Sequence, residues 1–179
     1  MQLVALKRAA MPYHHRIKEC SMIEIIEKKV LRGANIYSYR PVIVMTIDLA
    51  EYNEVPTSRI DGFVDKLLAM IPSLDDHRCS EGVKGGFIMR MREGTLLGHV
   101  IEHIALELQY IAYMDVGFGK TVDADESGMF NVIFSYWVEE AGIYAGVEAV
   151  KIVNSLLTGE VYDLESTIFR LKDIRDDHY

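Results

Sequence analysis

The spacing of apolar residues along the chain predicts a mixture of strands and helices. Short stretches rich in β-branched and aromatic residues indicate strands, and apolar residues three and four positions apart indicate helices. The expected strands are residues 23–30, 41–49, 86–91 and 129–137. The expected helices are residues 59–71, a helix that carries residues 96–108, and residues 139–157 and 163–174. The order β-β-α-β-α-β-α-α predicts an α+β fold, in which a small, mostly antiparallel sheet is covered by helices.

The length of the chain predicts a single domain. Its 179 residues are enough for one domain with a substantial core. That domain is expected to span residues 22–179, because the first well-patterned segment begins at Met22. Residues 1–21 are basic and lack the apolar core and cleavage site of a signal peptide. We expect them to form a leader or a flexible extension.

Charge and cysteine content restrict the possible functions. The chain carries 27 acidic and 19 basic residues, a net charge of −8, which argues against a nucleic-acid or anionic-membrane partner. It contains no run of about 18 apolar residues, so no membrane-spanning helix is expected. The two cysteines, Cys20 and Cys79, do not suggest a disulfide framework and are typical of a reducing, cytoplasmic protein. The sequence leaves the oligomeric state open, with a homo-oligomer as one option.

The strongest chemical motif is an H-x-x-E-H box at His99, Glu102 and His103. Two histidines four residues apart lie about 40° apart around a helix, so both imidazoles can bind one ion, for which Zn²⁺ is the expected identity. Glu102 is expected to act as the general base on a metal-bound water. The alternative is a helix whose histidines are simply partly buried or surface groups.

A catalytic zinc site normally has three protein ligands, so a third ligand is expected elsewhere in the chain. Glu139 is favoured and Glu140 is close behind, because both begin a separate helix after a strand. Glu107 lies one turn beyond His103 and is expected to orient an imidazole rather than bind the ion. Two further candidates come from a loop that would otherwise be unremarkable: His77 and Cys79.

Two arginines and a glycine-containing segment bear on the ligands of the domain. Arg90 and Arg92 could hold a substrate carboxylate in a bidentate manner, or could form ion pairs with nearby acids. The segment Gly119-Lys120-Thr121 resembles the end of a phosphate loop, but the glycine that this motif requires five positions before is Met114. No nucleotide site is expected in this chain.

Several separated blocks together resemble the N-terminal domain of the cyanophycin synthetase family. These blocks are LRGANIYSYRPVIVMTIDL, GGFIMRMREGTLLGHVIEHIALELQ, VGFGKT and FNVIFSYWVEEAGIYAG. The matched positions include Arg90, Arg92, Glu93, His99, Glu102, His103, Glu107 and Gln109, and the acid before A-G-x-Y-A-G aligns better with Glu139 than with Glu140. Residues 1–21 show no counterpart.

The resemblance implies handling of cyanophycin, a poly-aspartate chain with arginine on its side chains. In this family the ATP-dependent ligation resides in ATP-grasp and Mur-ligase-like modules, which this chain does not contain. Combined with the H-x-x-E-H box, the resemblance implies metal-dependent hydrolysis of the polymer to short Asp-Arg oligomers that can prime synthesis. The alternatives are a domain that binds the polymer without chemistry and a scaffold within a synthetase.

Overall fold

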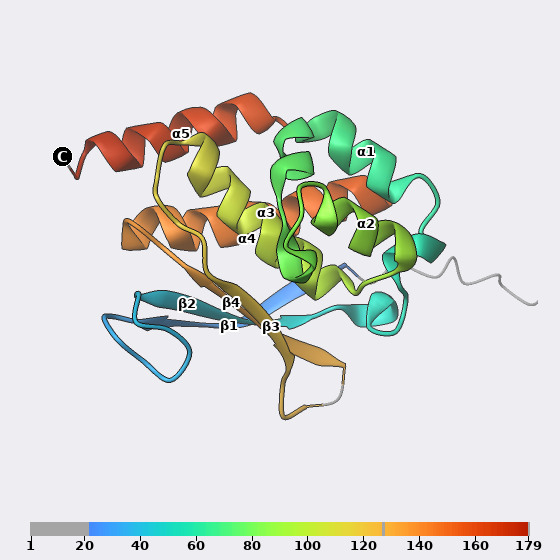
Figure 1. The fold of residues 1–179 in the computed structure, drawn as a ribbon, viewed down its shortest axis with the longest axis horizontal. Coiled ribbons are helices and arrows are strands. Elements are labelled where there is room, and N and C mark those ends of the chain that lie inside the picture. Colours follow the sequence, from blue (N-terminus) through green and yellow to red (C-terminus); the bar gives the residue numbers. More distant parts are fainter. Residues whose placement is uncertain (1–21, 127, 179) are drawn as a thin grey trace, which may run out of the picture.

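A four-stranded antiparallel sheet underlies the domain (Figure 1). The structure is a computed structural model that describes residues 22–126 and 128–178, so the extension predicted at residues 1–21 lies outside the described part. The strand order is β1-β2-β4-β3. The strands are β1 (Glu24–Leu31), β2 (Val42–Asp48), β3 (Gly119–Asp123) and β4 (Met129–Ser135).

The helices gather on one face of the sheet (Figure 1). They are α1 (Phe63–Met70), α2 (Gly86–Glu93), α3 (Leu97–Ile111), α4 (Glu139–Thr158) and α5 (Leu164–Asp176). Helices α3 and α4 pack against each other and against the sheet, and α5 packs against both of them. This arrangement confirms the predicted α+β class. No helix in the described part of the chain is long and apolar enough to cross a membrane.

The core lies between the sheet and α3 and α4. Ile43, Met45 and Ile47 of β2 are fully buried in this core. Their neighbours on β2, Val42 and Val44, face the opposite side of the sheet and form a smaller cluster there. Successive side chains of a strand point to opposite faces, so the buried residues of β2 pack in apolar clusters on both faces of the sheet.

Two glycines let α4 approach the sheet closely. A Cβ atom on Gly142 would lie 2.5 Å from the Tyr136 side chain and 2.7 Å from that of Ile43. At Gly146 it would lie 2.4 Å from the Met45 side chain. Any larger residue at either position would push the helix away from the strands.

The strand predicted for residues 86–91 is wrong, because this segment is helix α2. The buried residues of this segment are Phe87, Ile88 and Met91. Such a short apolar run is compatible with the repeat of a helix and with that of a strand, so it does not distinguish between them. Two glycines lie at the start of the helix. Gly85 has φ of 78°, and Gly86 packs so closely that a Cβ atom there would lie 2.2 Å from the carbonyl oxygen of Arg78. Gly94, with φ of 123°, ends the helix.

No strand was predicted in the polar segment at residues 119–123, but it forms strand β3. Its residues are half-buried or exposed, so the segment has no apolar pattern that would predict a strand. Pairing with β4 supplies the stability instead, in a register that sets Gly119 opposite Phe134 and Asp123 opposite Phe130. Tertiary pairing therefore overrides local propensity here.

Candidate metal centre

The two histidines of the H-x-x-E-H box project from one face of α3 and meet. Their Nε2 atoms lie 3.2 Å apart, and His103 is buried. Phe87 of α2 stacks on the His103 ring, with centroids 3.8 Å apart and an interplanar angle of 16°. Helix α2 thus fixes the orientation of an imidazole that α3 supplies.

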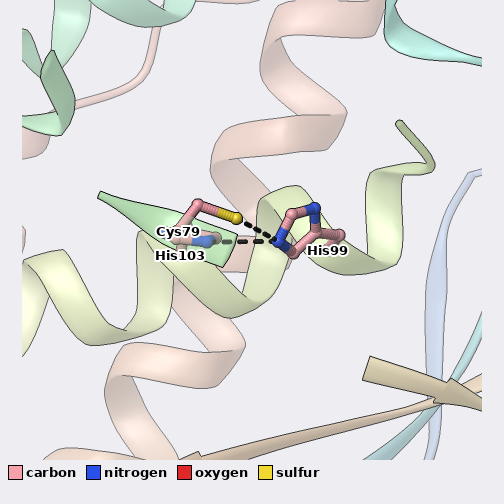
Figure 2. A group of neighbouring side chains, drawn as sticks. All are labelled: Cys79, His99 and His103. Atoms are coloured by element: carbon pink, nitrogen blue, oxygen red, sulfur yellow. Dashed lines mark hydrogen bonds between the residues drawn. The ribbon is translucent and has the colours of Figure 1, made fainter. Parts of the chain in front are cut away.

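Cys79 completes a group of three potential ligands (Figure 2). It lies on the 3-10 turn Cys79–Glu81, and its Sγ atom is 3.3 Å from Nε2 of His99. The three ligand atoms of Cys79, His99 and His103 lie within 4.8 Å of one another. The backbone at Cys79 has φ of 51°, in the left-handed region that residues other than glycine rarely adopt. Such strain persists where the surrounding structure imposes it, often at functional sites.

Two of the three separations between these ligand atoms are close to those of a tetrahedral zinc site, and the third lies within 4.8 Å. With Zn–N bonds near 2.05 Å and Zn–S bonds near 2.3 Å, two nitrogen ligands lie about 3.3 Å apart, and a nitrogen and a sulfur lie about 3.6 Å apart. The corresponding separations here are 3.2 and 3.3 Å. Three protein ligands leave a fourth position for water or substrate, which is typical of catalytic rather than structural zinc sites.

The hydrogen bonds behind His103 free its Nε2 atom for a metal. Oε2 of Glu107 lies 2.5 Å from Nε2 of His77, and Nδ1 of His77 lies 2.8 Å from Nδ1 of His103. If the Glu107 carboxylate accepts the Nε2 proton of neutral His77, then Nδ1 of His77 must accept the Nδ1 proton of His103. Nε2 of His103 then carries a lone pair. Such a relay behind a histidine ligand sets its tautomer and orientation.

His99 can present either tautomer to the group. Its Nδ1 atom lies 3.0 Å from the Thr95 hydroxyl, which can donate or accept a hydrogen bond. In the metal-free state, Nε2–H of His99 can donate to Nε2 of His103. Rotation of the Thr95 hydroxyl lets it accept from Nδ1–H instead, which leaves both Nε2 lone pairs free for one cation.

Burial keeps both imidazoles neutral, as metal binding requires. It lowers the pKa of His103 to about 2, with further contributions from His99 and His77. Burial also lowers the pKa of His99, and the nearby Arg90 guanidinium lowers it further. The residue types, the two short separations and the neutral imidazoles are therefore compatible with a Zn²⁺ ion.

Glu102 lies on the wall of the same cavity but is held by β3. The Thr121 hydroxyl donates a 2.6 Å hydrogen bond to Oε2 of Glu102. A Cβ atom on Gly119 would lie 2.3 Å from Oε1 of Glu102, so only glycine leaves room for the carboxylate. Burial raises the pKa of Glu102 to about 7, while the Thr121 hydrogen bond opposes this shift. The segment resembling a phosphate loop thus cradles a carboxylate.

An open cavity of about 1090 Å³ joins these groups. Its wall includes Cys79, His99, His103, Glu102 and Arg90. The volume suits a sizeable ligand, since small-molecule sites occupy roughly 300–1,000 Å³.

Arg92, the second predicted substrate-binding arginine, is not among the residues of this wall and binds Asp65 at 2.7 Å. Of the two arginines, the structure therefore brings only Arg90 to the histidines.

The structure does not bring Glu139 or Glu140 into the group of ligands. Glu139 makes a bidentate pair with Arg32, at 2.7 and 2.8 Å, and Glu140 lies 3.3 Å from Arg170. Both glutamates line a separate cavity between α4 and α5. Among the described residues, the third position beside the histidines belongs to Cys79.

Cys79 and His77 are more prominent in the structure than the sequence predicted. Each was predicted only as a possible ligand on an otherwise ordinary loop. The available signal was their spacing, with two metal-binding residue types separated by one position, upstream of a histidine pair. Nothing in the sequence pointed to the roles of Thr121 and Gly119 beside Glu102.

Comparisons with known proteins place this chain in a family. The family model of the cyanophycin synthase-like N-terminal domain matches residues 44–158. The cyanophycin synthetase of Geminocystis herdmanii is 44% identical over 156 residues, which cover 86% of this chain and 18% of that protein. The cyanophycin synthetase of Trichormus variabilis is 45% identical over 157 residues, covering 85% of this chain and 17% of that protein. The chain thus spans less than a fifth of these relatives, and it belongs to the cyanophycin synthase-like N-terminal domain family.

Proposed function

We propose that this domain is a metal-dependent peptidase that hydrolyses cyanophycin to short chains able to prime synthesis. The observation that carries the proposal is the convergence of Cys79, His99 and His103 on one point of a cavity that Glu102 also lines. A structural role would not require an open cavity beside three potential ligands. The substrate is proposed from the relatives, which are cyanophycin synthetases.

Each residue has a distinct part in this proposal. Cys79, His99 and His103 hold the ion. A bound Zn²⁺ lowers the pKa of a coordinated water to about 7 and polarises the scissile carbonyl. Glu102 accepts the proton of the attacking water on its carboxylate and delivers it to the amine that leaves. His77 and Glu107 are positioning residues that act through His103.

Arg90 supplies a positive charge for the substrate. It lies at the end of α2, its side chain is exposed on the cavity, and it is close enough to His99 to lower the pKa of that ring. Its guanidinium can bind a carboxylate in a bidentate manner. In an arginine-bearing aspartate polymer, each arginine branch presents such a carboxylate.

The proposed context is a cyanophycin synthetase. The domain would supply primers to ATP-grasp and Mur-ligase-like modules, either within the same polypeptide or as a partner of it. A reducing cytoplasm would keep the Cys79 thiol available as a ligand.

Mass analysis of soluble products tests the proposal. The chain is incubated with purified cyanophycin and Zn²⁺, in parallel with the Glu102→Gln variant and with a chelator. Glutamine keeps the shape of the side chain and can still accept from Thr121, but it cannot take the proton of a water. Short Asp-Arg oligomers from the wild type alone are expected. Absence of products from the metal-loaded wild type, or equal products from Glu102→Gln, would overturn the peptidase and leave polymer binding or scaffolding.

A further inference from the structure

Within residues 22–126 and 128–178, strand β3 pairs with another strand along one edge only. It pairs with β4 on one side only, and it is the last strand in the order β1-β2-β4-β3. In an antiparallel pair, alternate residues direct both backbone groups to the partner strand, and the residues between direct theirs away. Two backbone hydrogen bonds beside the ends of β3 identify the two sets of residues. The amide of Ala124 donates to the carbonyl of Met129, and the amide of Ser135 donates to the carbonyl of Phe118.

The alternation therefore leaves three residues with outward backbone groups. Even-numbered residues of β3 bond to β4, so the amide and carbonyl groups of Gly119, Thr121 and Asp123 point away from the sheet. Such a row of donors and acceptors is a template for another extended chain.

This edge runs along the candidate metal centre. All five residues of β3 line the cavity that contains Cys79, His99 and His103. Thr121 also contacts α3 directly, through its bonds to Glu102 and to the carbonyl of Gly98 at 3.4 Å. A chain paired to the edge would therefore lie beside the ligands and the proposed base.

We propose that the free edge of β3 binds the polypeptide backbone of the substrate in an extended conformation, as a fifth strand of the sheet. This inference rests on the proposed peptidase function and names how that site holds its substrate. Backbone pairing gives affinity without reading side chains. It also sends successive side chains to opposite faces, so neighbouring arginine-bearing branches do not collide.

A scan of substrate backbones tests the pairing from the substrate side, with β3 unaltered in the protein. A short synthetic chain of arginine-bearing aspartate units is N-methylated at one backbone amide at a time. Its binding to zinc-loaded Glu102→Gln and to wild type is measured by fluorescence anisotropy. Strand pairing uses alternate amides, so the loss of affinity is expected to follow a period of two, at least about tenfold at paired positions. An equal effect at every position, or no effect, would overturn strand pairing.

A second measurement uses the protein side of the pair. Proline at position 123 removes an outward amide without removing a bond to β4, a setting in which edge strands accept proline. Asp123→Ala changes the side chain alone. KM for the synthetic chain is expected to rise at least tenfold more in Asp123→Pro than in Asp123→Ala, and equal KM values would overturn the inference.

The two proposals can fail separately. If the wild type cleaves the polymer but the loss of affinity shows no period of two along the N-methylated positions, the peptidase is retained and pairing at the edge of β3 is rejected. Absence of cleavage would reject the peptidase, and the binding scan would then decide on the edge alone.

Discussion

Cys79 sets the chemical character of the candidate metal centre. A thiolate with two imidazoles suits Zn²⁺, whereas Mg²⁺, Ca²⁺ and Mn²⁺ prefer oxygen ligands. A carboxylate in the third position, as predicted for Glu139, would make a harder site. The ligand group that the structure brings together therefore favours zinc more strongly than the predicted one does.

Local geometry explains why the histidine pair could be predicted and the third position could not. His99 and His103 share a helix, so their spacing alone places them on one face. Cys79 lies 20 residues before His99 in the chain, on the loop before α2, and only the tertiary fold brings the two together. Glu139 satisfied every local criterion for a ligand, but the fold directs it to Arg32. Which side chain arrives from another element is a tertiary property that the sequence pattern does not contain.

The relay from Glu107 through His77 to His103 predicts a measurable effect on metal affinity. His77→Phe removes both hydrogen bonds of the ring and is expected to weaken Zn²⁺ binding by about 10–100-fold. His77→Gln retains an acceptor for Nδ1–H of His103 and is expected to recover part of that loss. Competition with a chromophoric chelator measures both affinities.

The visible spectrum of the Co²⁺-substituted protein serves as the control for the relay. The ligands themselves are unchanged, so a tetrahedral spectrum with a thiolate charge-transfer band is expected in both His77 variants. Affinities equal to that of the wild type would contradict the relay, and a changed ligand set would show that His77 itself binds the ion.

Arg90 and Arg92 form a matched pair that tests the charge at the cavity. Arg90→Ala is expected to raise KM for cyanophycin cleavage about tenfold, which corresponds to one carboxylate contact of about 1.4 kcal/mol. Arg92→Ala breaks an exposed pair with Asp65 and is expected to leave KM unchanged. Steady-state kinetics of soluble Asp-Arg oligomers distinguish the two. Equal KM values in both variants would contradict a substrate role for Arg90.

At the level of elements, the sequence pattern located most helices and strands, but it gave the wrong type for α2 and missed β3. β1, β2, β4, α4 and α5 were located to within a few residues. Helix α2 has an apolar pattern that suits a strand as well as a helix, and glycines lie at both of its ends. Strand β3 is polar and exists through its pairing with β4. Helix α2 and strand β3 are also elements that support the candidate site, through Phe87 and Thr121.

The junction of α4 and α5 depends on one phenol. The Tyr162 hydroxyl bonds to Oε2 of the buried Glu148 at 2.5 Å and to Oγ1 of Thr167 at 2.7 Å. Tyr162→Phe is expected to lower the free energy of unfolding by about 1–2 kcal/mol near neutral pH, because it leaves the carboxylate with fewer partners. Urea unfolding measures this difference.

The same residue predicts how that difference changes with pH. Burial, and then the bond to Glu148, raise the pKa of Tyr162 above its ordinary value of about 10. The contribution of the neutral phenol is therefore complete below pH 10 and is lost as pH rises through the raised pKa of the folded state. The stability gap between wild type and Tyr162→Phe is expected to narrow above pH 10. A gap that widens there would contradict this account.

At the scale of the whole molecule, the helices cover one face of the sheet, and β3 is one of its two edge strands. α3 supplies ligands and base, the loop before α2 supplies the thiol, and β3 forms the opposite wall. The fold class could be predicted from the order of helices and strands along the chain. The family could be predicted because several separated sequence segments resemble it in the same order. The cavity did not, since it arises where α2, α3 and β3 meet.

The central claim is that Cys79, rather than a glutamate, completes a metal centre with His99 and His103. X-ray absorption at the zinc edge of the stoichiometrically loaded protein tests it most directly. We expect one sulfur at about 2.3 Å and two imidazole nitrogens at about 2.0 Å. The sulfur shell should disappear in Cys79→Ser and persist in Ser80→Ala and Glu139→Gln. A zinc ion bound only by nitrogen and oxygen in the wild type, or a spectrum unchanged in Cys79→Ser, would contradict the account.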